Sequence, residues 1–254
     1  MIDLHSHLLP AVDDGARTVD QAVATLREMA RNGVTEICLT PHLLASRAEE
    51  GIPARHDAAF QTLRATAPAA PLLHRGAEVM LDRPLGHAAA ANPCVRLGRS
   101  RYILVEFPRM VAGATVSNAL AHVVSLGLVP LLAHPERYTS CSVHAVERWR
   151  RVGAFMQVDA TTLLSPRGRG ERARQLIATG LADIIAADNH GDTRMLLAGR
   201  RMIEEQGGDV QADLLTRYNP AAILADQPMR LVEPLELRAS LLERLRRLLS
   251  PADQ

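Results

Sequence analysis

Two histidines near the start of the chain, His5 and His7, stand two residues apart at the end of a short apolar run. Alternate residues of a β-strand point to the same side, so we expect the two rings to lie together. Paired imidazoles on one face suit a metal ion, although two histidines can equally be structural groups. The ends of the other predicted strands decide between these interpretations.

Most of the other predicted strands also end at a side chain that can bind a metal ion. The motifs are Thr40-Pro41-His42, Gly76-Ala77-Glu78, Val105-Glu106-Phe107-Pro108, Ala133-His134-Pro135-Glu136-Arg137 and Ala187-Asp188-Asn189-His190. A further carboxylate, Asp14, lies in Asp13-Asp14-Gly15, where a simple Asp-Gly turn is the alternative. Asp159, at the end of another strand, is open between ligand and turn residue.

The candidate metal ligands form a set of nine oxygen and nitrogen donors: His5, His7, Asp14, His42, Glu78, Glu106, His134, Asp188 and His190. Nine donors exceed the needs of one tetrahedral zinc ion and predict two or three divalent ions, with Glu78 as a bridge. The absence of cysteine ligands favours manganese, iron or zinc, and we expect manganese. Four carboxylates against three divalent ions leave about two positive charges, which suits a phosphate dianion.

Such a centre can hydrolyse a phosphate ester. Metal coordination lowers the pKa of water from near 16 to roughly 7, so a metal-bound hydroxide is the predicted nucleophile. Two arginines, Arg137 and Arg194, are candidate catalytic residues because a guanidinium group binds phosphate with two hydrogen bonds. The alternatives are a surface ion pair between Arg137 and Glu136, and ordinary solvent exposure for Arg194. The remaining histidines are predicted to be structural: His56, His74, His87, His122 and His144.

Other hydrolytic chemistries lack their motifs. A cysteine-based phosphatase needs an arginine six residues after its nucleophile, but the residues six after Cys38, Cys94 and Cys141 are Leu44, Ser100 and Glu147. No Gly-x-Ser-x-Gly elbow and no glycine-rich loop ending in Lys-Ser or Lys-Thr occurs. Metal-assisted hydrolysis therefore remains.

The elements that position these groups alternate between strands and helices. Apolar runs predict strands at Ile2–His5, Ile37–Thr40, Leu72–Glu78, Tyr102–Phe107, Val129–His134, Phe155–Asp159 and Ile184–Asp188. Amphipathic stretches predict helices at Thr18–Asn32, Val116–Leu126, Val143–Val152, Arg169–Thr179 and Arg194–Gln206. The alternation predicts a parallel α/β fold. A closed barrel is favoured over an open dinucleotide-binding sheet, and it brings the strand ends to one mouth.

The composition is that of one globular domain spanning residues 1–254, because 47% of its 254 residues are hydrophobic. A balance of 29 basic against 28 acidic residues does not favour nucleic acid as a partner. No apolar run is long enough for membrane insertion and no signal peptide is apparent, so we expect a cytoplasmic protein. An amphipathic helix is predicted at about 235–249; it packs on the barrel, joins copies of the chain into a homo-oligomer, or docks on another partner.

Taken in order, the motifs resemble the PHP (polymerase and histidinol phosphatase) superfamily: His-x-His, Thr-Pro-His, a glutamate, His-Pro and Asp-x-His. A narrower set resembles its CpsB/YwqE branch of bacterial manganese-dependent protein tyrosine phosphatases. This set is Asp3-Leu4-His5-Ser6-His7, Asp13-Asp14-Gly15, Thr40-Pro41-His42, Glu106-Phe107-Pro108, His134-Pro135-Glu136-Arg137 and Asn219-Pro220.

The resemblance implies a distorted (β/α)7 TIM-like barrel and a trinuclear metal centre. The implied substrate is the phosphorylated, tyrosine-rich tail of a bacterial tyrosine kinase that controls capsule or exopolysaccharide biosynthesis. The nine donors fall on the family's ligands and Arg137 on its phosphate-binding arginine. Arg194 stands slightly nearer to the preceding histidine than the family's second arginine, and Ala187 stands where serine is commoner.

Two other functions remain compatible with the resemblance. A histidinol-phosphate phosphatase, or another small-molecule PHP phosphoesterase, has the same metals but a different substrate pocket. A non-catalytic PHP module binds metal only for stability or docks on a polymerase.

Overall fold

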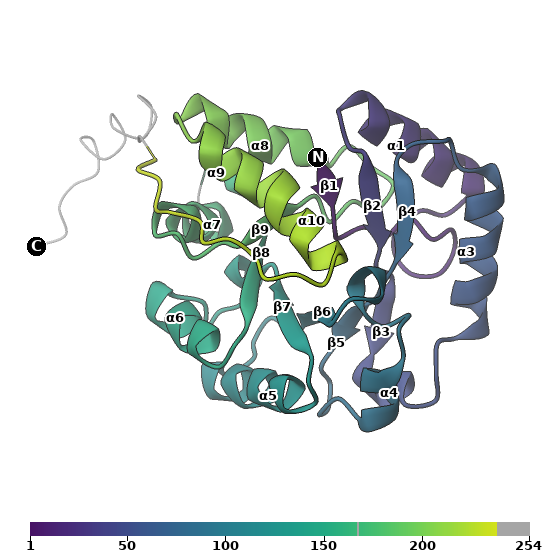
Figure 1. Ribbon diagram of the computed structural model, residues 1–254, viewed down its shortest axis with the longest axis horizontal. Helices are drawn as coiled ribbons and strands as arrows, with labels where there is room; N and C mark the ends of the chain where they lie inside the picture. Colours follow the sequence, from purple (N-terminus) through teal and green to yellow (C-terminus); the bar gives the residue numbers. More distant parts are fainter. Residues whose placement is uncertain (167, 238–254) are drawn as a thin grey trace, which may run out of the picture.

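The computed structural model describes residues 1–166 and 168–237 and consists of parallel β-strands surrounded by helices (Figure 1). Three strands form one sheet in the order β1-β2-β4: β1 Ile2–Asp3, β2 Glu36–Leu39 and β4 Leu72–Arg75. Six strands form a second sheet, in this order: β3 His42–Leu44, β5 Glu78–Met80, β6 Tyr102–Glu106, β7 Val129–Ala133, β8 Phe155–Asp159 and β9 Ile184–Ala186. Each predicted strand region contains an observed strand.

One of the predicted strands is interrupted, and its two ends belong to different sheets. The prediction of one uninterrupted strand at Leu72–Glu78 is wrong, because β4 ends before Gly76 and β5 begins only at Glu78. A Cβ at Gly76 would lie 2.9 Å from the sulfur of Cys38, so neighbouring side chains occupy the space beside this glycine. Likewise β2 passes into β3 across Pro41, which has no N–H for a strand ladder.

The ends of the two sheets meet, so strand pairing continues from the last strand back to the first. Ser6, just after β1, forms a parallel bridge with Asn189, just after β9. The N–H of His7 donates to the carbonyl of Asn189 at 2.7 Å, and the N–H of Thr40 donates to the carbonyl of Ser6 at 2.8 Å. The prediction of an α/β fold with parallel strands is confirmed, and closure of all strands into a barrel stays a prediction.

Helices lie around the outside of the strands (Figure 1). The main ones are α1 Val19–Arg31, α3 Ala54–Thr66, α5 Gly113–Ser125, α6 Val143–Arg151, α7 Arg169–Ala178 and α8 Leu196–Glu205. The shorter ones are α2 Ala45–Ala48, α4 His87–Ala91, α9 Asp209–Asp213, α10 Asn219–Leu224, a π-helical turn at Leu214–Tyr218 and 3₁₀ turns at Leu97–Arg99, Pro135–Arg137 and Thr162–Leu164. The five predicted helices are confirmed to within a few residues. Helix α3 was not predicted.

The buried side chains of the strands form two layers, as the period-2 alternation requires. On β6, Ile103 and Val105 pack in the cluster that contains Val116 and Leu120 of α5. The intervening Leu104 packs in a second cluster with residues of other strands, on the face turned away from α5. Side chains of this second parity lie inside the ring of strands.

The chain's end is described only in part. The amphipathic helix predicted at about 235–249 lies outside the described residues, except for 235–237, which are not helical. No helix in the described part of the chain is both long and apolar enough to cross a membrane.

Candidate metal centre

All nine predicted donors lie together at one end of the strands. His5 and His7 follow β1, Glu106 ends β6, His134 follows β7 and Asp188 follows β9. The other four come from nearby starts and loops: Asp14 on the loop after β1, His42 opening β3, Glu78 opening β5 and His190 after β9. Helix-flanked parallel strands place their carboxyl ends at one mouth, which explains the convergence of the donors that end or follow a strand.

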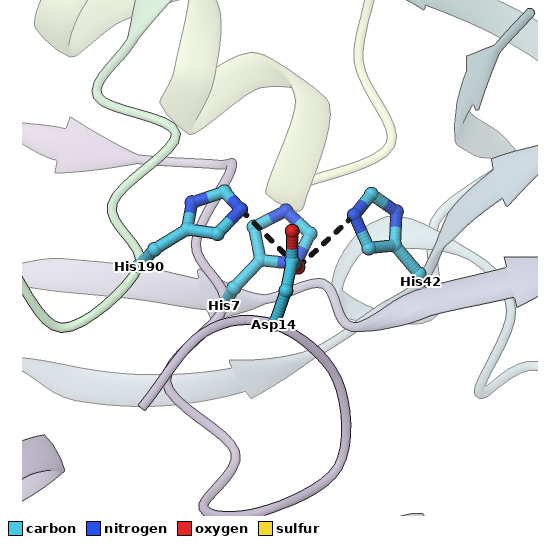
Figure 2. Close-up of side chains that lie close together, drawn as sticks. All are labelled: His7, Asp14, His42 and His190. Atoms are coloured by element: carbon cyan, nitrogen blue, oxygen red, sulfur yellow. Dashed lines mark ion pairs between the residues drawn. The ribbon is translucent and has the colours of Figure 1, made fainter. Parts of the chain in front are cut away.

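The donors fall into overlapping groups whose candidate ligand atoms lie within 4.8 Å of one another. In the part of the chain that the structure describes, these groups are His7–Asp14–His42–His190, His5–Glu78–His134, His5–His7–Asp188 and His42–Glu78–Glu106. Figure 2 shows the first group, with Asp14 between two imidazoles. Its Oδ1 lies 3.4 Å from Nε2 of His42 and 3.4 Å from Nε2 of His190.

His5 and His7, which belong to three of these groups, each lie close to carboxylate oxygens of both Glu78 and Asp188. Nε2 of His5 lies 3.2 Å from Nε2 of His7, 3.2 Å from Oε2 of Glu78 and 3.2 Å from Oδ1 of Asp188. Nε2 of His7 lies 3.3 Å from each of the same two oxygens. All four side chains are buried, so water does not screen them from one another.

The other ring nitrogens of these two histidines are already hydrogen-bonded. Nδ1 of His5 lies 2.8 Å from Oε1 of Gln157, and Nδ1 of His7 lies 2.8 Å from Oδ2 of Asp13. When both Nδ1 atoms carry the hydrogen and donate to these oxygens, the neutral rings present bare lone pairs at Nε2. Lone pairs 3.2 Å apart repel unless a cation lies between them. The donor set therefore fits a metal ion.

The group formed by His42, Glu78 and Glu106 also fits a metal ion. Nδ1 of His42 lies 3.0 Å from Oε2 of Glu78 and 3.0 Å from Oε1 of Glu106. Both oxygens are buried and neither has a hydrogen-bond partner among the described residues. Buried carboxylate oxygens without partners are costly unless a cation compensates them. Glu78 belongs to two groups, as a bridging carboxylate does.

The raised pKa values of His42 and His7 also indicate that the surroundings of these rings are negatively charged. Burial alone lowers the pKa of a histidine, but the carboxylates of Glu106 and Glu78 outweigh burial at His42 and raise its pKa to about 10. The pKa of His7 is likewise raised well above its ordinary value, by Asp13, Asp188 and Glu78 against the effect of burial. The site thus favours positive charge at the imidazoles, which a divalent cation supplies when it replaces the protons.

Arg137 lies directly beside this cluster. Its Nη2 donates to Oδ2 of Asp188 and to Oδ2 of Asp159, each at 2.5 Å. The alternative of a surface ion pair with Glu136 is wrong, because Glu136 is fully buried and accepts the N–H of Asp159. Asp159 lies outside the donor groups of the described residues.

Arg194 lies at the edge of the same cluster and is only partly exposed. Its Nη1 lies 3.6 Å from Oδ2 of Asp188, and its Nη2 lies 2.7 Å from Oδ2 of Asp192. Both candidate arginines therefore approach the same carboxylate oxygen. Whether either binds phosphate stays a prediction.

Residues 1–225 match the family model described as capsular polysaccharide synthesis, CpsB/CapC. The chain belongs to the CpsB/CapC family. Its relatives include the tyrosine-protein phosphatase CpsB of Streptococcus pneumoniae, 27% identical over 89% of this chain and 99% of the relative. The tyrosine-protein phosphatase YwqE of Bacillus subtilis is 28% identical over 75% of this chain and 77% of the relative.

Solved structures with the same fold include one from the crystallographic work on YwqE of Bacillus subtilis and CpsB of Streptococcus pneumoniae, described there as metal-dependent tyrosine phosphatases. It matches with a TM-score of 0.77 and 23% identity, covering 94% of this chain and 100% of that one. A TatD homologue from Escherichia coli matches with a TM-score of 0.52 and 17% identity, over 90% of this chain and 98% of that one. These likenesses show the fold.

The CpsB/CapC chain also contains supporting residues that the motifs did not single out. Oδ2 of Asp13 accepts hydrogen bonds from Nδ1 of His7 and from the N–H of His42, the latter at 3.0 Å. Its Oδ1 accepts a hydrogen bond from the N–H of Gly15 at 3.0 Å. Partners of this kind fix the tautomer and orientation of a metal-binding histidine. The sequence shows two adjacent aspartates, Asp13 and Asp14. Only their positions in the structure distinguish Asp13, which supports His7, from Asp14, the predicted ligand.

Two donors of this CpsB/CapC chain have a strained backbone. The φ angle is 33° at His134 and 48° at Asp188, in the left-handed region that side chains with a Cβ rarely adopt. Such a conformation costs about 1–2 kcal/mol and is maintained by surrounding structure. At both residues it ends the strand and turns the next segment across the mouth.

Proposed function

We propose that this protein is a metal-dependent protein tyrosine phosphatase whose nine donors hold two or three manganese ions. The family match and the names of its relatives support phosphatase activity in capsular polysaccharide synthesis. The proposed partner is the phosphorylated tail of a tyrosine kinase in that system. The single domain, the cytoplasmic location and a homo-oligomeric state stay predictions from the sequence.

One observation supports the proposal above all: the buried Nε2 atoms of His5 and His7 each lie 3.2–3.3 Å from a carboxylate oxygen of Glu78 and from one of Asp188. When bound there, divalent ions supply the positive charge that activates a water molecule and holds phosphate oxygens. Burial of the donors strengthens these electrostatic interactions relative to water.

The protein's own residues then bind and orient the phosphate ester. Arg137 binds a phosphate oxygen, and Asp159 holds the guanidinium group at the edge of the donor cluster. Arg194 contributes a second positive charge near the same oxygen of Asp188. The phenol released from tyrosine has a pKa near 10, so its departure needs less protonation than that of an alkoxide.

The test compares substrates on the metal-loaded protein. We expect hydrolysis of a phosphotyrosine peptide and of phenyl phosphate, little turnover of histidinol phosphate, and loss of all activity after chelation. Preferential turnover of histidinol phosphate would instead indicate a small-molecule phosphoesterase. Stoichiometric metal binding without release of phosphate from any ester would indicate a non-catalytic module and overturn the proposal.

A further inference from the structure

A cavity of about 230 Å³ opens beside the donor cluster, and its walls include Glu106, His134 and Arg137. A molecule that occupies this cavity therefore contacts both the candidate metal centre and the proposed phosphate-binding arginine. The cavity's other walls belong to segments on which no function has been placed. The inference drawn from them rests on the proposed function.

One wall of the cavity is apolar and fixed in place. It includes Met80, Phe107 and Pro108. The ring of Phe107 is buried and meets Tyr138 edge to face, with the centroids 6.2 Å apart. The hydroxyl of Tyr138 donates to the carbonyl of Ala133 at 2.9 Å, which anchors the pair to the end of β7. This wall suits the aromatic ring of a phosphotyrosine.

The wall of the cavity also contains basic residues. Arg109, on the loop after β6, and Arg169, the first residue of α7, line the same cavity as Arg137. Burial first, and then the positive charges of Arg109, Arg137 and Arg172, lower the pKa of Arg169. The arginines thus lie close enough to repel one another, and such repulsion is relieved by an anion.

These positive charges differ in how they are compensated. The charge of Arg137 is balanced by Asp159 and Asp188. Neither Arg109 nor Arg169 forms an ion pair with any residue in the ranges 1–166 and 168–237. The whole chain has a net charge of only +1, so the positive charges of Arg109 and Arg169 are a local feature of the cavity wall.

Hydrogen bonds hold the segments that contain Arg109 and Arg169 next to the 3₁₀ turn Pro135–Arg137 and the residues that follow it. The carbonyl of Arg109 accepts the N–H of Thr139 at 3.1 Å, which fastens the loop after β6 to the segment after β7. Nε of Arg172 donates to the carbonyl of Glu136 at 2.8 Å, which fastens the start of α7 to the same segment. The two side chains are therefore presented from anchored segments.

We propose that Arg109 and Arg169 form an anion-binding rim that selects phosphotyrosine peptides with an acidic residue next to the phosphotyrosine. The phosphate lies at the donor cluster and Arg137, and the tyrosine ring lies against Phe107. The flanking carboxylate of the peptide then reaches the rim, where guanidinium groups bind carboxylates with paired hydrogen bonds.

Binding to non-hydrolysable peptides tests this inference. Three labelled peptides carry phosphonomethyl-phenylalanine in place of phosphotyrosine and differ only in flanking residues: glutamate, glutamine or lysine. With metal-loaded protein, fluorescence anisotropy is expected to give the lowest Kd for the glutamate peptide, about 5-fold below glutamine, with lysine weakest. The preference is expected to shrink as salt is raised, because screening weakens exposed charge pairs.

Variants connect the preference to the rim. In the double variant Arg109→Gln/Arg169→Gln, the ratio of Kd between the glutamine and glutamate peptides is expected to fall toward one. Arg201→Gln serves as the matched control, because Arg201 is exposed on α8 and outside the cavity wall. Equal Kd values for these two peptides in the unmodified protein would overturn the inference, as would an unchanged ratio in the double variant.

Turnover of phenyl phosphate, which has no flanking residue, is measured in parallel and reports separately on the proposed function. Hydrolysis of phenyl phosphate without peptide discrimination leaves a phosphatase with no selective rim. A glutamate preference that depends on Arg109 and Arg169, in a protein that hydrolyses no ester, supports the rim and removes the proposed catalysis.

Discussion

Arg137 and Asp188 share one hydrogen bond that connects the proposed phosphate-binding group to the candidate metal centre. Oδ2 of Asp188 accepts Nη2 of Arg137 at 2.5 Å, while Oδ1 of Asp188 lies 3.2 Å from Nε2 of His5. One oxygen of this carboxylate therefore faces the guanidinium group, and the other faces the candidate metal ligands.

Replacement of Arg137 separates catalysis from metal binding. We expect Arg137→Ala to lower kcat/KM for phenyl phosphate by about 100-fold or more, as when one charge-stabilising donor is removed from an active site. The metal content is expected to stay unchanged, since Arg137 is not among the nine donors. Elemental analysis and steady-state kinetics measure both quantities. Arg201→Ala is the control, and near-normal kcat/KM in Arg137→Ala would contradict the proposed role.

Asp159 is expected to act through Arg137. Its Oδ1 accepts the N–H and hydroxyl of Thr161 at 2.8 Å, and its Oδ2 holds the guanidinium group. Asp159→Asn is expected to lower kcat/KM about 10-fold, because a hydrogen bond to a charged group is weakened. In the Arg137→Ala background the same substitution is expected to have little further effect. Additive losses in this double-mutant cycle would show that Asp159 acts independently.

Asp13 is expected to control metal affinity. Burial raises the pKa of its carboxyl, but the hydrogen bond to His7 outweighs burial and lowers the pKa to about 2, so the group is ionised at neutral pH. Asp13→Asn is expected to weaken metal binding about 10–100-fold, as for other partners of metal-binding histidines. Activity is expected to recover with excess metal.

The matched control for Asp13 is Asp20→Asn, at an exposed position in α1. Competition with a chromophoric chelator measures the metal affinity of each variant. An affinity in Asp13→Asn equal to that of the unmodified protein would show that His7 needs no carboxylate to bind the metal.

The raised pKa of Glu136 predicts that the free energy of unfolding falls as the pH rises. Burial, followed by the charge of Asp159, raises its pKa from 4.5 to about 8. The folded protein thus binds this proton more tightly than the unfolded chain, so its stabilising contribution is complete below about pH 4.5 and is lost as the pH rises through 8. Glu136→Gln, which resembles the protonated acid, is expected to lack this decline.

Denaturant unfolding of both proteins between pH 5 and 8, at one metal concentration, measures the difference. The free energy of unfolding is expected to fall more with rising pH in the unmodified protein than in Glu136→Gln. Parallel pH profiles would indicate that Glu136 is already ionised across this range.

Much of the fold was predictable because its signals are local. A buried strand such as Tyr102–Glu106 is a continuous apolar run, and α1 begins at Thr18, whose side chain accepts the N–H of Gln21. The break at Gly76 was not predictable, since it depends on the close approach of Cys38 from another strand. Helix α3 was missed because its hydrophobic face is weak: its buried residues are only His56, Phe60 and Leu63.

The candidate site was predictable to the extent that strand ends identify it. A donor after a strand, such as Asp188, is expected at the mouth wherever parallel strands converge. The contacts of Gln157 and Asp159 were not predictable, because these residues lie within or at the end of β8 and their partners are distant in sequence. The left-handed backbone at His134 was not predictable, because a residue with a Cβ keeps this conformation only where the surrounding structure holds it.

The location of bound metal tests the account most directly. Crystals of the manganese-loaded protein, measured at the manganese absorption edge, are expected to show an anomalous peak among Nε2 of His5, Nε2 of His7, Oε2 of Glu78 and Oδ1 of Asp188, with one or two further peaks beside His42. Anomalous density elsewhere on the protein, with these four atoms hydrogen-bonded to one another or to water, would contradict the account.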